Sequence, residues 1–512
     1  MRRTVAVAVL AVALVGPGAA GTRAPAIAGG QARNVIVVMT DDQSIETMAA
    51  MPKTKALIGG RGVTFEQAVV SFPLCCPSRA TLLTGRFAHN HGVFANRAPA
   101  GYEAFRDTPA TLPETLQARG YRTIHVGKYL NNYGLADPTE VPRGWSRWRG
   151  LVDPSTYWMH GFTLNSDGRL RVVGDPQIAD PRTYQTDVLA RIATTEITRA
   201  ARAGKPFYLE LMTLAPHGEL PYPGQTEAVD PRAAPRHEGL FRGVRAPRTA
   251  AFDEVDVSDK GSLVKRRGRF GPGTLRRIDL LYANRREALL SVDDAVASIV
   301  ETLEAEGIVD DTVIVFTSDN GFMQGEHRFQ YGKFVPYEPS IRVPLLIAGP
   351  GVAVGVRSPQ LVSNVDLAPT ILGLLGISTA TGPFDGHDLS GHLADPSTAL
   401  PRTVLLETYP FGATDQELSE LEAMLLLEDP DVVSYAGIRT DRYLYVEMTD
   451  GTVELYDLVN DPDQLESIAS DPSVSSIRAT LSNLLVMLRT CSGVTCREIE
   501  SLGVSLLGAA AR

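Results

Sequence analysis

A cysteine stands just ahead of a segment whose residue types suit the binding of an anion. The run Cys75–Arg86 reads CCPSRATLLTGR, and Pro77 suits the first position of a helix because a proline N–H would be unpaired there anyway. The free N–H groups and the positive dipole end of a helix N-terminus attract anionic groups. Arg79 adds a forked, permanently charged guanidinium nearby. The segment therefore predicts that a sulfur side chain, an anion-binding helix start and an arginine meet at one site.

The spacing argues against a cysteine phosphatase. Such an enzyme needs an arginine at a fixed distance after its cysteine, and that position holds Thr81 when counted from Cys75, or Leu82 when counted from Cys76. A structural alternative stays open, in which two neighbouring cysteines are simply buried ahead of an ordinary helix. The acidic residues elsewhere in the chain bear on this choice.

Two acidic clusters offer oxygen ligands to a metal ion. Asp41 and Asp42 follow one short apolar run, and Asp319 and Asn320 follow another. Hard oxygen ligands select calcium or magnesium over zinc or copper. A divalent cation would offset the carboxylates and polarise an oxygen of a bound anion. Either cluster alone also fits solvated loop carboxylates, but the two clusters together with the cysteine segment favour a metal site.

Buried strands are expected to position both clusters. Asn34–Thr40, Thr312–Thr317 and Val343–Ala348 have the β-branched, apolar composition of buried parallel strands. Apolar residues recur at helical spacing from Val292 to Leu303, ahead of a helix-ending Gly307. Strands that alternate with helices predict an α/β sheet with helices on both faces. Ligands of such sheets bind beyond the carboxyl ends of the strands, where both acidic clusters stand.

The C-terminal part of the chain has a different pattern. Ser434–Met448 and Thr452–Asp457 alternate in the manner of strands, with Asp450 and Gly451 between them as a hairpin turn. A helical segment follows around Ile477–Leu488. We expect a small antiparallel sheet with a helix packed on it.

The N-terminus reads as an export signal over residues 1–26. Arg2 and Arg3 precede the apolar run Val5–Val15, and small residues continue through Ala26. The apolar run is too short for a comfortable membrane span, so we expect cleavage, no stable membrane span afterwards, and a secreted or cell-surface product. A retained membrane anchor is the alternative.

The composition restricts the kinds of partner that the protein can bind. A net charge of -10 argues against a nucleic-acid partner, since phosphate neutralisation needs clustered Lys and Arg. In an exported protein Cys491 and Cys496 are either a small disulfide loop or two free thiols, and their spacing does not decide between these.

The run CCPSRATLLTGR matches the sulfatase signature, Cys-x-Pro-Ser-Arg followed by Leu-Thr-Gly-Arg, with Cys75 in the signature position. Asp-Asp near the N-terminus and Asp-Asn-Gly late in the chain also resemble the metal pattern of that family, which belongs to the alkaline phosphatase-like superfamily. The segments GKYLNNYG, GWSRW and ALLSVDD are similar to the N-acetylglucosamine-6-sulfatase subgroup. The resemblance extends from Asn34 to Pro462.

The resemblance implies a large mixed, mostly parallel α/β sheet flanked by helices, with a small C-terminal antiparallel sheet plus helix. We expect a catalytic domain at residues 27–400 and a C-terminal subdomain at residues 401–512. The implied activity is hydrolysis of a sulfate ester on a sulfated small molecule or glycan, such as a glucosamine-6-sulfate unit.

The resemblance also implies the cofactors. In sulfatases the signature cysteine is oxidised to formylglycine after translation, so the resemblance implies that a formylglycine-generating enzyme modifies Cys75. One hydroxyl of the hydrated aldehyde would attack sulfur, and the second would later expel sulfate. Calcium, with magnesium as the alternative, would bind the two acidic clusters and the modified residue: Asp41, Asp42, Cys75, Asp319 and Asn320.

Further residues are implied around the sulfate. Arg79, Lys128 and Lys333 would stabilise charge on its oxygens, and His217, in the segment APHGELP, would meet the leaving oxygen. Many sulfatases carry a histidine two residues after the first lysine, but Leu130 holds that position here, so the base for sulfate release is not assigned.

Two other functions remain open. One is a phosphate or phosphonate ester hydrolase of the same superfamily, because phosphoryl and sulfuryl groups have similar shapes. The other is a non-catalytic binder of sulfated glycans, in which Cys75 is never converted.

Overall fold

The computed structural model describes residues 33–510, apart from 107, 227–228, 381, 401 and 409–433. The expected export signal at residues 1–26 therefore lies outside the described residues. None of the described helices is long and apolar enough to cross a membrane.

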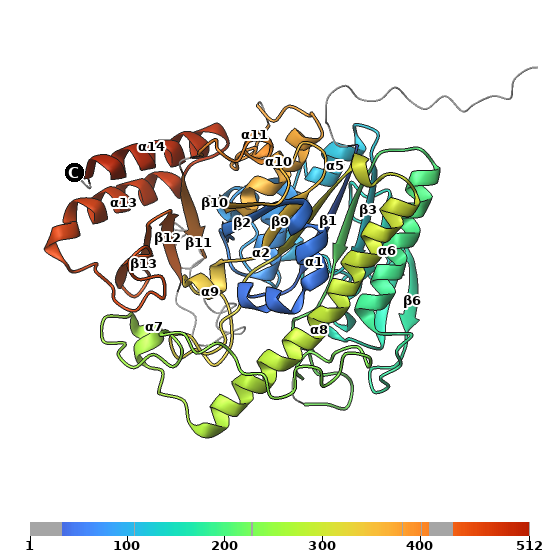
Figure 1. The fold of residues 1–512 in the computed structure, drawn as a ribbon, viewed down its shortest axis with the longest axis horizontal. Helices are drawn as coiled ribbons and strands as arrows, with labels where there is room; N and C mark the ends of the chain where they lie inside the picture. Colours follow the sequence, from blue (N-terminus) through green and yellow to red (C-terminus); the bar gives the residue numbers. More distant parts are fainter. Residues whose placement is uncertain are drawn as a thin grey trace, which may run out of the picture.

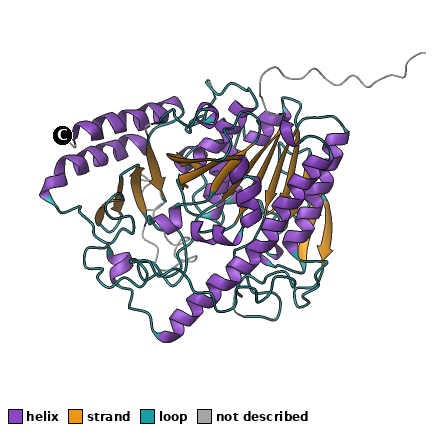
Figure 2. Ribbon diagram, in the orientation of Figure 1, coloured by secondary structure: helices purple, strands orange, loops and turns teal. Residues whose placement is uncertain are grey.

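The buried, β-branched runs form the middle of a large sheet (Figures 1 and 2). Its ten described strands follow the order β10-β2-β9-β8-β1-β7-β3-β4-β5-β6. β1 pairs in parallel with both β7 and β8, as expected. The expectation of a parallel strand at Val343–Ala348 is wrong, because β9 runs antiparallel to both β2 and β8. The predicted mixed, mostly parallel sheet is therefore confirmed. The strand bounds are β1 (Asn34–Thr40), β2 (Gly62–Val69), β3 (Arg122–Gly127), β4 (Arg147–Leu151), β5 (Phe162–Ser166), β6 (Arg169–Val173), β7 (Phe207–Met212), β8 (Thr312–Ser318), β9 (Leu345–Ala348) and β10 (Val356–Ser363).

The side chains of β1 alternate between two cores, one on each face of the sheet. Val35 and Met39 belong to one core, and Ile36 and Val38 belong to the other. A strand that is covered on both sides needs apolar residues at every position, which explains the unbroken run NVIVVMT. The first core is closed by α2 (Cys75–Thr84), α5 (Leu112–Gln117) and α10 (Leu367–Leu374), and the second by α1 (Pro52–Leu57), α6 (Gln185–Arg202) and α8 (Pro272–Ala305).

Helices α6 and α8 run along the sheet in Figure 1, and α8 is longer than the sequence pattern indicates. We expected a helix over Val292–Leu303, but α8 starts at Pro272, with that proline in its first turn. Its buried stripe includes Arg285, and this charged residue interrupts the apolar periodicity. The expected start of α2 also needs correction, because the helix begins at Cys75 and Pro77 is its third residue.

Short helices lie in the connections between strands. They are α3 (Ala88–His91), α4 (Tyr102–Phe105), α7 (Ser262–Lys265), α9 (Glu338–Ile341) and α11 (Ser390–Ala394).

A second, antiparallel sheet is built from the C-terminal part of the chain, as predicted. Its strands lie in chain order: β11 (Thr403–Glu407), β12 (Tyr435–Thr440), β13 (Tyr443–Met448) and β14 (Val453–Asp457). One face packs on α13 (Ser475–Leu488), the predicted helix, and on α14 (Val494–Ala510), which the sequence pattern did not indicate. The division of the chain at residue 400 stays a prediction.

The other face of the small sheet packs against the part of the chain that carries the large sheet. Val404, Tyr435 and Leu444 share a core with Met323 and Tyr337. The open question about the two late cysteines is also settled, since Cys491, in the connection after α13, forms a disulfide with Cys496 in α14.

Candidate active site

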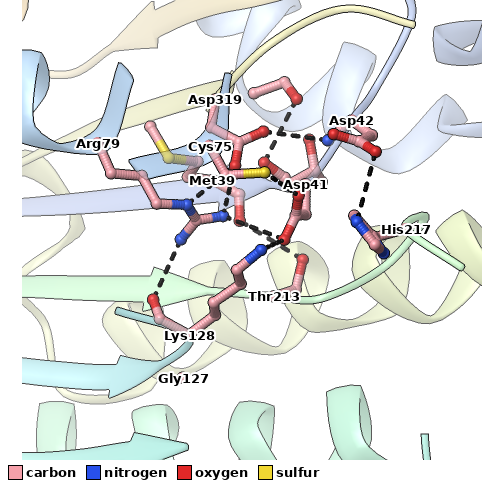
Figure 3. A network of polar contacts seen from close by, with 12 residues as sticks. Met39, Asp41, Asp42, Cys75, Arg79, Gly127, Lys128, Thr213, His217 and Asp319 are labelled. Atoms are coloured by element: carbon pink, nitrogen blue, oxygen red, sulfur yellow. Dashed lines mark hydrogen bonds and ion pairs between the residues drawn. The ribbon is translucent and has the colours of Figure 1, made fainter. Parts of the chain in front are cut away.

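Strand pairing brings the two acidic clusters together. Thr40 on β1 lies opposite Ser318 on β8, so the residues that follow them, Asp41 and Asp319, leave the sheet side by side (Figure 3). The Asp42 N–H donates to Asp319 Oδ1 over 3.0 Å, and Asn320 Nδ2 donates to Asp42 Oδ1 over 2.7 Å. The side chains of both clusters, Asp41, Asp42, Asp319 and Asn320, are buried.

Cys75 lies at the N-terminus of α2 and faces this cluster. Its Sγ atom is 3.5 Å from Asp41 Oδ1 and 2.6 Å from Lys333 Nζ. One turn further along, the Ser78 hydroxyl donates to the carbonyl of Asp319 and accepts a 2.9 Å bond from Asn364 Nδ2, which fixes the helix start. Burial raises the pKa of the Cys75 thiol to about 12, so the unmodified side chain is neutral at pH 7 and a poor nucleophile.

Two buried cations lie on the other side of Asp41 and Asp319. Arg79 places Nε 2.9 Å and Nη2 2.8 Å from Asp319 Oδ2, and its Nη1 donates to the carbonyl of Lys128 over 3.1 Å. Lys128 Nζ is 2.5 Å from Asp41 Oδ2. Burial opposes ionisation of Asp41, but Lys128, His217 and Arg79 outweigh burial and lower its pKa to about 2. The site therefore holds Asp41 as a carboxylate.

Lys333 and His217 approach Asp42 from different loops. Lys333 Nζ is 2.5 Å from Asp42 Oδ1, and His217 Nε2 is 3.7 Å from Asp42 Oδ2. Burial lowers the pKa of His217, although the two aspartates favour its protonated form. Its Nδ1 lies 2.6 Å from the Gly218 carbonyl, and this contact orients the ring so that Nε2 faces the cluster.

The donor set fits a hard cation. Asp41, Asp42 and Cys75 each offer a ligand atom, and these atoms lie within 4.8 Å of one another. Asn320 Oδ1 is buried without a hydrogen-bond partner, which suits a carbonyl oxygen that ligates a metal. The Asp319 carboxylate is engaged by Arg79 and by the N–H groups of Asp42 and Asn320. The structure thus brings together every residue predicted for the metal and the sulfate.

A cleft of about 1010 Å³ opens over this cluster. Cys75, His217 and Lys333 contribute to its wall, together with Asp153 and Tyr157. The Tyr157 ring lies between two of the predicted residues: its centroid is 4.6 Å from Lys128 Nζ and 5.2 Å from the His217 ring centroid. Sequence reasoning missed Tyr157 and Asp153 because neither belongs to a motif.

Leu130, which replaces the expected histidine, packs in the core and is 1% exposed. Two histidines near Leu130 in sequence make their contacts outside the cleft. His125 stacks on Trp148 and contacts Glu210, and His89 contacts Glu407; none of these residues lines the cleft.

Arg285 on α8 is a third residue that sequence reasoning missed. Its guanidinium donates to the carbonyl of Asp42 and, over 3.3 Å, to the carbonyl of Pro216, and it stacks on Phe322. Burial lowers its pKa to about 10. The sequence did contain a signal for this role: Arg285 is a charged residue within the apolar stripe of α8, four residues before Leu289. Arg285 ties the acidic loop to the loop that carries His217.

Comparison with known proteins places this geometry in a family. A model described as Sulfatase matches residues 33–377. The chain is 35% identical to N-acetylglucosamine-6-sulfatase of Homo sapiens over 509 residues, covering 94% of this chain and 87% of that protein. It is 32% identical to an arylsulfatase of Volvox carteri, covering 92% and 76%. A solved structure of a protein in complex with its substrate D-glucosamine-2-N,6-O-disulfate matches with a TM-score of 0.71 at 21% identity, covering 91% of this chain and 98% of that one. The chain belongs to the sulfatase family.

Proposed function

We propose that this sulfatase removes the 6-O-sulfate group from glucosamine units of a sulfated sugar or glycan. The name of the human relative, at 35% identity, supports this substrate. The disulfated glucosamine bound in the matching structure agrees with it. The observation that carries the proposal is the position of Cys75, whose sulfur lies in the wall of the cleft between Lys333 Nζ and Asp41.

The proposal includes two groups that complete the site. Cys75 would be converted to formylglycine, which when hydrated supplies a hydroxyl nucleophile and a second hydroxyl for sulfate release. Calcium, or magnesium, would be held by the oxygen ligands and the modified residue and would draw charge from a sulfuryl oxygen. The unpartnered Asn320 Oδ1 and the low pKa of Asp41 support such a site.

The remaining residues have roles that follow from their positions. Lys128 and Lys333 place two ammonium groups beside the reacting position, where preorganised charge stabilises a transition state. Arg79 holds Asp319 and the backbone of Lys128 in place. His217, in the protonated form that Asp41 and Asp42 favour, would donate the Nε2 proton to the departing sugar oxygen, a contribution worth roughly 10²–10⁴-fold in rate.

The first test replaces the nucleophile precursor. Cys75→Ser leaves one hydroxyl and no second hydroxyl for sulfate release, so turnover of glucosamine-6-sulfate should fall by at least about 10³-fold, while circular dichroism stays that of the wild type. Cys76→Ser is the matched control, because it changes the neighbouring buried cysteine outside the metal cluster. Near-normal turnover by Cys75→Ser would refute the assignment.

Two measurements distinguish a sulfatase from a non-catalytic glycan binder and from a phosphoester hydrolase. Intact mass spectrometry of active protein should find a mass below that of the thiol form, because conversion to formylglycine removes sulfur, whereas ordinary thiol oxidation adds oxygen. An unmodified thiol in the purified protein would favour a non-catalytic glycan binder. A higher kcat/KM on an aryl phosphate than on glucosamine-6-sulfate would favour the phosphoester hydrolase.

We also propose that the protein is secreted or displayed at the cell surface, after a formylglycine-generating enzyme has acted on it. The charged and apolar pattern of residues 1–26 supports export. N-terminal sequencing of protein from the culture medium should find a chain that starts between Ala20 and residue 27.

A further inference from the structure

The cleft that receives an anionic substrate contains a carboxylate. Among the described residues that line it, Asp153 is the one acidic side chain, and Arg97, Arg267 and Lys333 line it as well. A carboxylate in such a site repels the sulfate group, so its presence calls for a favourable contact elsewhere on the substrate.

Asp153 is held in place by the loop that follows β3. The N–H of Asn132 donates to Asp153 Oδ2 over 2.7 Å, and the N–H of Asp153 donates to the carbonyl of Tyr133 over 3.1 Å. Asn132 takes a left-handed backbone conformation, with φ at 72°, which asparagine tolerates better than most residues. The Asn132 bond therefore fixes the orientation of the Asp153 carboxylate at the wall of the cleft.

Asp153 also lies close to the reacting groups. Its charge acts on Tyr157 and on Lys128, and Tyr157 contacts both Lys128 and His217. Burial raises the pKa of Asp153 because the carboxylate has lost much of its water. Donors on a bound ligand would replace that water, and a carboxylate accepts such bonds strongly.

We propose that Asp153 is a specificity-determining residue that accepts hydrogen bonds from hydroxyl groups of the sugar ring that carries the sulfate ester. This inference rests on the proposed function and deepens it. A polyhydroxylated sugar sulfate gains these bonds, whereas an aryl sulfate has no donor for Asp153 and meets only its negative charge. Asp153 therefore selects sugar sulfates over aryl sulfates of the same charge.

The test compares kcat/KM for glucosamine-6-sulfate with kcat/KM for 4-nitrophenyl sulfate. Asp153→Asn keeps the shape but removes the charge and half of the acceptor capacity, so the sugar-to-aryl ratio should fall about 10- to 100-fold. Asp167→Asn is the matched control, because Asp167 also accepts a hydrogen bond from a backbone N–H, that of Trp148 over 2.8 Å, but does not line the cleft. The sugar-to-aryl ratio of this control variant should stay that of the wild type.

A test on the substrate side needs no variant. For the wild-type enzyme, kcat/KM should be about 10- to 100-fold lower on the 3-deoxy or the 4-deoxy analogue than on glucosamine-6-sulfate itself. For Asp153→Asn, kcat/KM on that analogue should equal its kcat/KM on glucosamine-6-sulfate. An unchanged ratio in Asp153→Asn, or full wild-type activity on both deoxy analogues, would overturn the role of Asp153 while leaving the proposed function intact. A wild type that cleaves the aryl sulfate but no glucosamine-6-sulfate would overturn both.

Discussion

The positions of individual residues explain why this site needs so many buried charges. Asp41, Asp42 and Asp319 lie behind Cys75, and Lys128 and Lys333 pair with two of them at 2.5 Å. Each of these charged side chains would be costly to bury alone, and the ion pairs between carboxylates and ammonium groups offset that cost. A divalent cation would pair with the carboxylates in place of Lys128 and Lys333, and the two ammonium groups could then contact the sulfate. The charges are thus arranged for a ligand as well as for stability.

Arg285 allows a prediction about metal affinity. Arg285→Lys keeps a positive charge but cannot hold the carbonyls of Asp42 and Pro216 together in the same geometry. Because such supporting residues affect metal affinity or activity by about 10–100-fold, the calcium concentration that gives half-maximal activity should rise by that factor.

The measurement is a calcium titration of chelator-treated enzyme. Arg286→Lys is the control, since Arg286 stacks on Phe241 and Tyr282 away from the acidic cluster. Full activity of the wild type after exhaustive chelation would contradict the metal proposal itself, and an unshifted curve for Arg285→Lys would contradict only the role of Arg285.

Motif residues at strand ends could be predicted from the sequence, whereas supporting residues could not. Asp41 and Asp319 follow short buried strands, so their meeting place follows from parallel pairing, and Cys75 is marked by its signature. Asp153 and Tyr157 lie in a connection without periodicity, and their place depends on how that connection folds over the sheet. Arg285 lies 243 residues from Asp42, and no local pattern encodes this contact.

At the level of elements, α3 is joined to the small sheet by a titratable contact. His89 Nδ1 is 2.8 Å from Glu407 Oε2 on β11, and its Nε2 is 3.0 Å from the carbonyl of Cys491. Burial opposes the charged form of His89, but Glu407 outweighs burial and raises the pKa of His89 to about 9. The contact therefore links two elements through a protonated imidazole at neutral pH.

This contact predicts how stability depends on pH. Because the folded-state pKa is raised from 6.5 to about 9, the contribution of His89 is complete below pH 6.5 and is lost as the pH rises past about 9. His89→Gln should lower the free energy of unfolding by about 1–3 kcal/mol at pH 6, and the gap should shrink toward zero above pH 9. Urea unfolding of the wild type and His89→Gln across this pH range measures the difference in their free energies of unfolding. A difference that stays constant with pH would refute the prediction.

At the level of the whole molecule, the two sheets share their interior. Val404 and Tyr435 of the small sheet pack with Met323 and Tyr337, and the buried Arg402 pairs with Asp366 before α10 and with Glu500 on α14.

The shared core predicts that both sheets unfold together. Calorimetry should record one transition, and Glu500→Gln, which weakens the partner of the buried Arg402 2.8 Å away, should lower its midpoint without splitting it. Glu498→Gln, on the same helix, is the control. Two resolved transitions in the wild type would mean that the small sheet is an independent unit.

The pairing of β1 with β8 has a consequence for the chain as it is made. Asp42 and Asp319 are 277 residues apart in sequence yet joined by a hydrogen bond, and β8 is translated long after Cys75. A nascent polypeptide that has not yet reached Asp319 holds the cysteine and only half of the oxygen donors. Ribosome-bound intermediates therefore lack the complete acidic cluster, and the enzyme becomes active only after most of its length has been synthesised.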